Sequence, residues 1–128
     1  MSLLSPGGAA LVKLMGETPR GPRREGVFAL WLTLRVAEDL LLTPAQTERG
    51  VKRRVAALER RLSSLSLPAQ LRRALVTALA ELNEPRPEKA GQVLQLLVAP
   101  AREALGSDAA EVLSRAARSA SQRVREDS

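Results

Sequence analysis

The chain has 128 residues, a net charge of +6 at pH 7, and neither cysteine nor histidine. It therefore has no disulfides, no thiolate metal ligands and no imidazole, the commonest general base and metal ligand. The length is sufficient for one domain that buries its own core. The apolar residues are almost all Leu, Ala and Val, with no Ile or Tyr, which favours helices over strands. We therefore expect a single all-α domain.

The net charge is concentrated in one segment of the chain. Residues 44–73 carry eight basic and two acidic side chains, whereas residues 1–43 sum to +1 and residues 74–128 to −1. A surface of this sign attracts acidic proteins or nucleic acids, or is simply solvated. The segment 44–73 is therefore a candidate binding surface.

Residues 1–25 are predicted to form a short helix followed by a loop rich in Pro and Gly. A secretory signal needs basic residues ahead of its apolar core, and no charged residue precedes Lys13. Together with the absence of cysteine, this favours a cytoplasmic protein. An organellar targeting segment is the alternative, because this stretch is poor in acids and contains Arg20, Arg23 and Arg24.

The segment Gly26–Leu42 is predicted to be the helix around which the fold packs. It contains both aromatic residues of the chain and its densest apolar run. Read at a helical period, one stripe is purely apolar, and a second combines aromatic surface with charge. The first stripe consists of Val27, Leu30, Leu34, Ala37 and Leu41, and the second of Phe28, Trp31, Arg35, Glu38 and Leu42, with Asp39 beside it.

The second stripe of this helix has two interpretations. In the functional one, Phe28, Trp31 and Leu42 contact another protein chain and Arg35 orients it, because aromatic residues and Arg are enriched at interfaces. In the structural one, the helix is buried among several neighbours. The stripe could also lie on a membrane surface, but the charges at 35, 38 and 39 interrupt the run too early for the helix to span one.

A second long helix is predicted from Pro44 to about Leu65. Thr43, Pro44 and Gln46 form a capping box at its start. Its apolar residues recur at alternating steps of four and three, the heptad pattern of a helix that lies along a partner. They are Val51, Val55, Leu58, Leu62 and Leu65, and the opposite side of the helix carries Arg49, Arg53 and Arg60.

Three further helices are predicted in the rest of the chain. They cover residues 69–82, 87–105 and 107–124, separated by a loop at 83–87 and by Gly106. Pro100 is expected to bend the second of them, because proline removes a backbone hydrogen bond. The inner face of the last helix is mostly Ala and buries little apolar area.

These elements predict an all-α, single-domain bundle of four to five helices, to which a short N-terminal helix can be added. Residues 1–25 form the N-terminal segment, residues 26–124 the bundle, and residues 125–128 a frayed tail. No stretch of the sequence identifies a protein family.

The sequence offers no group of residues suited to catalysis. The adjacent carboxylates Glu38 and Asp39 are typical of solvated or capping side chains, as is the cluster Glu81, Glu84 and Glu88. A two-metal site in a helical bundle needs Glu-x-x-His pairs, which this chain cannot form. It also contains no P-loop, dinucleotide-binding or zinc motif. We therefore expect no enzyme activity, no cofactor, no metal site and no small-molecule substrate.

The basic segment is the candidate polyanion site. Nucleic-acid phosphates are neutralised by Arg and Lys gathered on one helical face. The side chains in question are Arg49, Lys52, Arg53, Arg60 and Arg61. The segment contains neither aromatic residues for base stacking nor a base-reading Asn or Gln on its basic face, so nucleic-acid binding of this kind would be non-specific.

We therefore predict a non-enzymatic, helical protein–protein interaction module, either an adaptor or a scaffold that associates with itself as a homo-oligomer. Phe28, Trp31, Arg35 and Leu42 are its predicted partner-binding residues. The alternative is a small nucleic-acid-binding or transcription-regulatory protein that acts through the Arg-rich segment 49–73.

Overall fold

The computed structural model describes residues 5–42, 48–84 and 86–127, and all regular structure within these ranges is helical. The prediction of an all-α bundle is confirmed, but the described ranges hold six α-helices rather than four to five. The elements are α1 (Pro6–Glu17), α2 (Pro22–Leu42), α3 (Glu48–Ser64), α4 (Ala69–Ala80), the short 3₁₀ helix η2 (Glu81–Asn83), α5 (Glu88–Leu105) and α6 (Ser107–Asp127).

The N-terminal segment supplies the additional helix. Ser5 caps α1, because its hydroxyl accepts a hydrogen bond from the Gly8 amide at 3.0 Å, and Pro6 occupies the first helical position. The α1 helix packs on α2 and α6 through the buried Leu11. At its first turn, a side chain on Gly7 would lie 3.2 Å from Leu34 of α2, so the two helices approach closely there.

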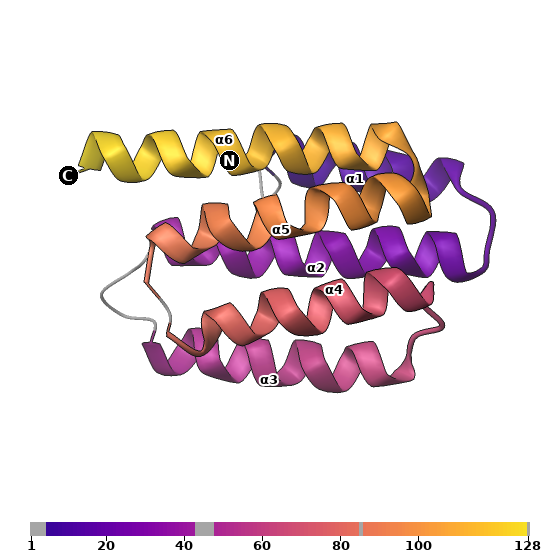
Figure 1. Cartoon of the computed structure of the whole chain (residues 1–128), viewed down its shortest axis with the longest axis horizontal. Helices are drawn as coiled ribbons and strands as arrows, with labels where there is room; N and C mark the ends of the chain where they lie inside the picture. The colour runs from indigo at the N-terminus through magenta and orange to yellow at the C-terminus, as the bar shows by residue number, and fades with distance from the viewer. Residues whose placement is uncertain (1–4, 43–47, 85, 128) are drawn as a thin grey trace.

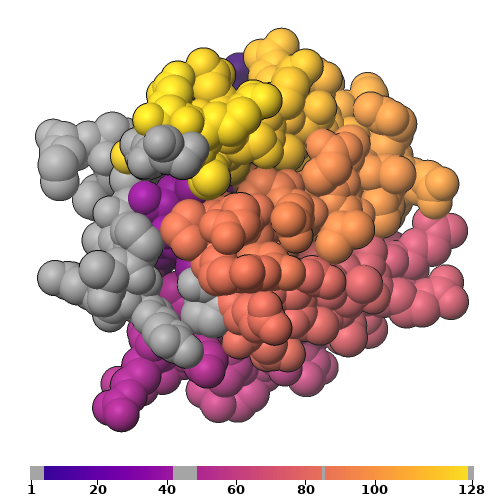
Figure 2. Space-filling view, turned by 60° about the vertical axis from the view of Figure 1, so that its left-hand side comes forward, coloured from indigo at the N-terminus to yellow at the C-terminus, as the bar shows by residue number. Residues whose placement is uncertain are grey.

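The helices lie roughly side by side along the long axis of the molecule (Figure 1). From top to bottom in this view, α6 and α1 are followed by α5, α2, α4 and α3. Figure 2 brings one end forward and shows the same order, with α6 above α5 and α3 at the base. The most extensive contact is between α5 and α6, whereas α2 contacts α1, α3, α5 and α6.

Helix α2 buries four of the five residues that the sequence assigned to its core stripe. Val27, Leu30, Leu34 and Ala37 are at most 2 % exposed, whereas Leu41, near the end of the helix, is only half-buried. The helix begins at Pro22, one turn before Gly26, because proline is favoured in the first turn. Gly26 lies at a crowded crossing, where an added Cβ would come within 2.9 Å of a Leu105 methyl and 3.0 Å of a Leu71 methyl.

Helix α3 lies at the edge of the bundle, against α2 and α4. Its predicted seam is buried from Val51 to Leu62, whereas the predicted capping box at residues 43–46 lies outside the described residues. The carboxyl end of α3 is capped from α4. The Arg72 guanidinium donates hydrogen bonds to the carbonyl of Leu62 at 2.8 Å and to that of Leu65. The Arg72 guanidinium therefore has a structural role in the fold.

Helices α5 and α6 form a close pair. Pro100 lies inside α5, which continues to Leu105, and Gly106 ends it with a positive φ of 103°. Buried alanines of α6 allow close approach, and an added Cβ on Gly91 would lie 2.6 Å from the Ser121 hydroxyl oxygen. Helix α6 extends to Asp127, three residues past its predicted end at Val124.

None of the described helices combines the length and the apolarity needed to cross a lipid bilayer. The predicted absence of a transmembrane segment therefore agrees with the part of the chain that the structure describes.

Candidate functional site: two grooves along helix α2

The two aromatic residues of the chain stack on one another on the outer side of α2. The ring centroids of Phe28 and Trp31 are 6.0 Å apart and their planes differ by 27°. Both side chains are half-buried, and Trp31 packs against the edge of the core. Trp31 is therefore neither a fully buried core residue nor a freely exposed one.

Two arginines cover these aromatic rings. The Arg35 guanidinium lies 5.1 Å from the centre of the Trp31 ring system, and that of Arg61, from α3, lies 5.5 Å from the Phe28 ring centre. Such cation–π contacts hold a planar guanidinium against an aromatic ring and leave its edge free to donate hydrogen bonds. The pair of rings thus fixes two cationic donor groups next to one another.

A groove of about 480 Å³ runs between α2 and α3 beside these residues, and we name it the α2–α3 groove. Its lining is mainly apolar, with Arg35, Arg54 and Arg61 as its cationic members. Arg54 forms an ion pair with Asp39 across the groove, although the Arg54 side chain is 58 % exposed. The lining comprises Phe28, Leu32, Arg35, Val36, Asp39, Arg54, Ala57, Leu58 and Arg61.

The structure brings together three of the four predicted partner-binding residues. Phe28, Trp31 and Arg35 form one continuous cluster. Leu42 is the last residue of α2, and its side chain lies outside the described part of the structure. Arg61, predicted as a polyanion-binding residue, instead joins this cluster through its contact with Phe28.

The other predicted polyanion-binding residues remain on the outer surface of α3. Arg49, Lys52, Arg53 and Arg60 are all exposed. Arg54 belongs to the predicted basic segment, but the structure places it in the α2–α3 groove, where it pairs with Asp39. The seam indicated that α3 lies along a partner, but periodicity does not tell which helix that partner is. The role of Arg54 in the α2–α3 groove therefore required the structure.

The indole of Trp31 contains a polar atom without a partner. Its Nε1 atom is buried and has no hydrogen-bond acceptor among the described residues. An unpaired buried N–H group is unfavourable by about 1–3 kcal/mol. The aromatic pair is therefore held in place by packing and by the arginines.

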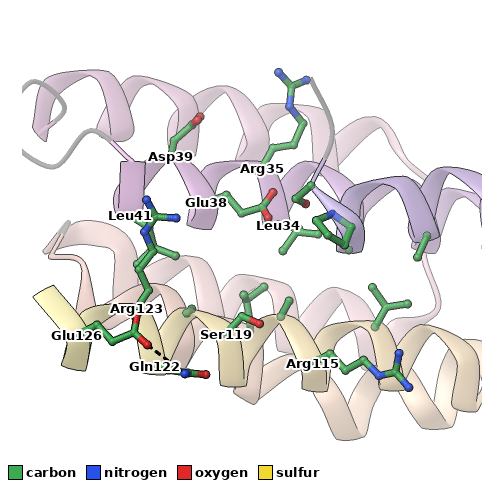
Figure 3. Close-up of a pocket in the computed structure, with 18 residues that line it drawn as sticks. Leu34, Arg35, Glu38, Asp39, Leu41, Arg115, Ser119, Gln122, Arg123 and Glu126 are labelled. Carbon is green, nitrogen blue, oxygen red and sulfur yellow. Dashed lines mark hydrogen bonds between the residues drawn. The ribbon is translucent and has the colours of Figure 1, made fainter. Parts of the chain in front are cut away.

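A second groove, of about 920 Å³, lies on the other side of α2, and we name it the α2–α6 groove (Figure 3). Helix α6 forms one wall, α2 and the start of α1 form the other, and Leu94 of α5 contributes to the lining. In Figure 3, Glu38 lies on the α2 side of the groove, and Ser119 and Arg123 lie on the α6 side. The sequence did not predict this groove, because its walls come from four helices distant in the chain.

Glu38 is the half-buried carboxylate of the α2–α6 groove. Burial raises the pKa of its carboxyl group above the ordinary value of 4.5, and a hydrogen bond donated by the Ser5 hydroxyl opposes that rise. Asp39, the next residue, points away from α6 in Figure 3 and pairs with Arg54 on α3. Of the two adjacent carboxylates, predicted to be solvated or capping groups, Glu38 thus lines only the α2–α6 groove, whereas Asp39 lines both.

The two grooves differ in the chemistry of their linings. Among the described residues, no group of three or more acidic side chains is placed to hold a metal ion. The α2–α3 groove presents a mainly apolar surface with guanidinium groups, whereas the lining of the α2–α6 groove is about half polar and includes the half-buried carboxylates Glu38 and Asp39. The chain matches no protein-family model, no curated protein and no solved structure.

Proposed function

We propose that this protein is a non-enzymatic interaction module that binds an acidic, amphipathic segment of another protein in the α2–α3 groove. The observation that carries the proposal is the pair of arginines, Arg35 and Arg61, stacked on the two aromatic rings beside the groove. Self-association through this groove and a cytoplasmic location remain predictions.

The apolar lining provides the area for binding. Leu32, Val36 and Leu58 line the groove between the two helices, with Phe28 at its side. An amphipathic helix buries one apolar stripe in such a groove, with anchor residues one and two turns apart. Burial of aromatic and aliphatic surface contributes most of the affinity of such contacts.

The arginines select the charge of the partner. Three guanidinium groups line the groove against a single carboxylate, that of Asp39. Because Arg35 and Arg61 are already held against aromatic rings, little side-chain entropy is lost when they bind a carboxylate in a bidentate manner. A segment with Glu or Asp beside its apolar stripe therefore fits the groove better than a basic one.

The experiment that tests this proposal uses a pair of synthetic peptides of about 16 residues, long enough to form a helix. One carries a leucine stripe flanked by Glu, and the other carries the same stripe flanked by Lys. Fluorescence anisotropy with the full chain is expected to show binding of the Glu peptide only. Arg61→Gln is expected to weaken this binding by about tenfold, the effect of losing one charge-assisted contact.

The matched control is Arg60→Gln, which removes the same charge from the neighbouring, exposed position of α3. Its effect on peptide binding is expected to be small. Equal losses in the Arg60 and Arg61 variants would show that net charge alone attracts the peptide, and equal binding of both peptides would show no charge selection. Either result contradicts the proposal.

A nucleic acid is the second candidate partner, because Arg49, Lys52, Arg53 and Arg60 are exposed together on α3. Binding of duplex DNA through such residues must weaken steeply with salt, with a log–log slope of about 0.9 per phosphate contact. Binding that persists at physiological salt and is weakened by Arg53→Gln and Arg60→Gln, but not by Arg61→Gln, would favour this alternative over the peptide groove.

A further inference from the structure

The α2–α6 groove is separate from the proposed peptide site. Only Arg35 and Asp39 line both grooves, and in Figure 3 both side chains point away from α6. The remaining lining of the α2–α6 groove comes from α1, α5, α6 and the inner residues of α2. Its volume, about 920 Å³, lies within the range of about 300–1,000 Å³ that is typical of small-molecule sites.

The apolar part of this groove can hold a hydrocarbon body. Its accessible apolar surface comes from half-buried side chains, Leu41 of α2 and Val112 and Ala116 of α6. Leu34 and Leu94 are at most 1 % exposed and support this surface from beneath. The apolar part of a ligand would therefore bury surface on α2 and α6.

Among the described residues, Glu38 has no basic partner in this groove. Its hydrogen-bond donor is the Ser5 hydroxyl, and within the described residues no Lys or Arg forms an ion pair with it. A partly desolvated carboxylate without a cation is an unfavourable arrangement that a bound cation would relieve.

The cationic side chains of the groove are directed elsewhere. Arg35 lies over Trp31, and Arg115 pairs with Glu111 at 2.9 Å. Arg123 extends from α6 toward the end of α2, where Leu41 lies (Figure 3). The remaining acidic groups are Asp39, which pairs with Arg54, and Glu126, which accepts a hydrogen bond from Gln122 at 3.1 Å. Glu38 is thus the carboxylate left for a ligand.

We propose that the α2–α6 groove binds a small amphiphilic amine, whose ammonium group pairs with Glu38 and whose apolar body lies on Leu41, Val112 and Ala116. An ammonium group has three donors. Glu38 accepts one of them, and polar groups of the opposite wall, such as the Ser119 hydroxyl, are available to accept another.

The experiment compares three probes with the same hydrocarbon chain: octylamine, octanol and octanoate. Each is titrated into the full chain below its micellar concentration, and binding is followed by calorimetry and by NMR shifts of residues in α2 and α6. Octylamine is expected to bind at least about tenfold more tightly than octanol, the effect of a hydrogen bond to a charged group. Octanoate is expected to bind more weakly still, because Glu38 repels it.

Two variants test whether the preference for octylamine depends on Glu38. Glu38→Gln keeps the size of the side chain and removes its charge, so octylamine and octanol are expected to bind it with nearly equal affinity. Glu103→Gln is the matched control, since Glu103 is exposed on α5 and does not line the groove. NMR titration of the Glu38 carboxyl provides a second readout, because a bound ammonium group lowers the pKa that burial had raised.

Every other outcome overturns the proposal. Preference for octanoate would make Arg123 the charged determinant, and equal binding of all three probes would show an apolar groove without charge selection. If Glu126→Gln weakened octylamine binding and Glu38→Gln did not, the ammonium group would bind at Glu126 on α6. Absence of binding by octylamine would show that the groove is not a site.

Arg61→Gln, which affects only the proposed peptide groove, is expected to leave octylamine binding unchanged.

Discussion

Glu38 and Asp39 are neighbours in sequence but have different surroundings. On a helix, adjacent residues point about 100° apart, so one turns toward α6 and the other toward α3. Asp39 finds a cation in Arg54, and Glu38 is half-buried with only a hydroxyl donor among its described neighbours. The sequence showed two adjacent carboxylates but gave no sign of which would be desolvated, because burial depends on the neighbouring helices.

We predict that Glu38 lowers the stability of the fold at neutral pH. Its pKa is raised in the folded state, so folding favours the protonated form. The stabilisation from protonated Glu38 is complete below the unfolded pKa and is lost as the pH rises through the folded pKa. Urea unfolding should therefore show Glu38→Gln to be more stable than the wild type at pH 7, with no difference at pH 3. A constant difference at both pH values would contradict this sign.

At the scale of single elements, the sequence predicted most helices well. The core stripe of α2, the heptad seam of α3 and the passage of α5 through Pro100 all follow from the spacing of apolar residues and proline. The helix in residues 6–17 was only partly predicted, although Ser5 followed by Pro6 is a recognisable start signal. Periodicity gives the angle of a side chain on its own helix and leaves the facing helix unknown.

Arg72 has a structural role that the sequence does not reveal. By sequence it belongs to the basic segment, whereas in the structure it caps α3 with two hydrogen bonds to carbonyl groups. We predict that Arg72→Ala destabilises the fold by about 1–3 kcal/mol, because both bonds come from a charged donor. Chemical denaturation monitored by circular dichroism measures this loss.

Arg73 provides the control for that measurement. It is the next residue and is exposed, so Arg73→Ala removes an equal charge without removing the cap. A change within about 0.5 kcal/mol is expected for such a surface substitution. Similar losses in the two variants would attribute the effect to charge and not to the capping of α3.

For the whole molecule, the position of α3 sets the distribution of charge. The helix that carries most of the net charge lies at the edge of the bundle, where it packs mainly against α2 and α4. Its exposed face can therefore meet solvent or a partner without disturbing the α5–α6 pair. The sequence showed which segment carries the net charge. That this segment lies beside the aromatic pair of α2 could be seen only in the packed structure.

We predict that added salt stabilises this fold slightly. The exposed basic residues of α3 repel one another, and at 1 M salt the screening length falls to about 3 Å. Thermal unfolding should show a higher midpoint in NaCl than at low ionic strength. The gain should shrink in the double variant Arg53→Gln/Arg60→Gln. A midpoint that falls with NaCl would show that the ion pairs of this surface outweigh its repulsion.

The ridge formed by Arg35 and Asp39 is a wall of both grooves. A side chain shared by two cavities adopts one position at a time, so under the two proposals a ligand that moves Arg35 or Asp39 in one groove would alter the binding free energy in the other. Thermodynamic linkage would make this effect reciprocal: if an amine changed the affinity for a peptide by some factor, the peptide would change the affinity for the amine by the same factor. If both proposals hold, one binding event in this chain of 128 residues would be conditional on the other.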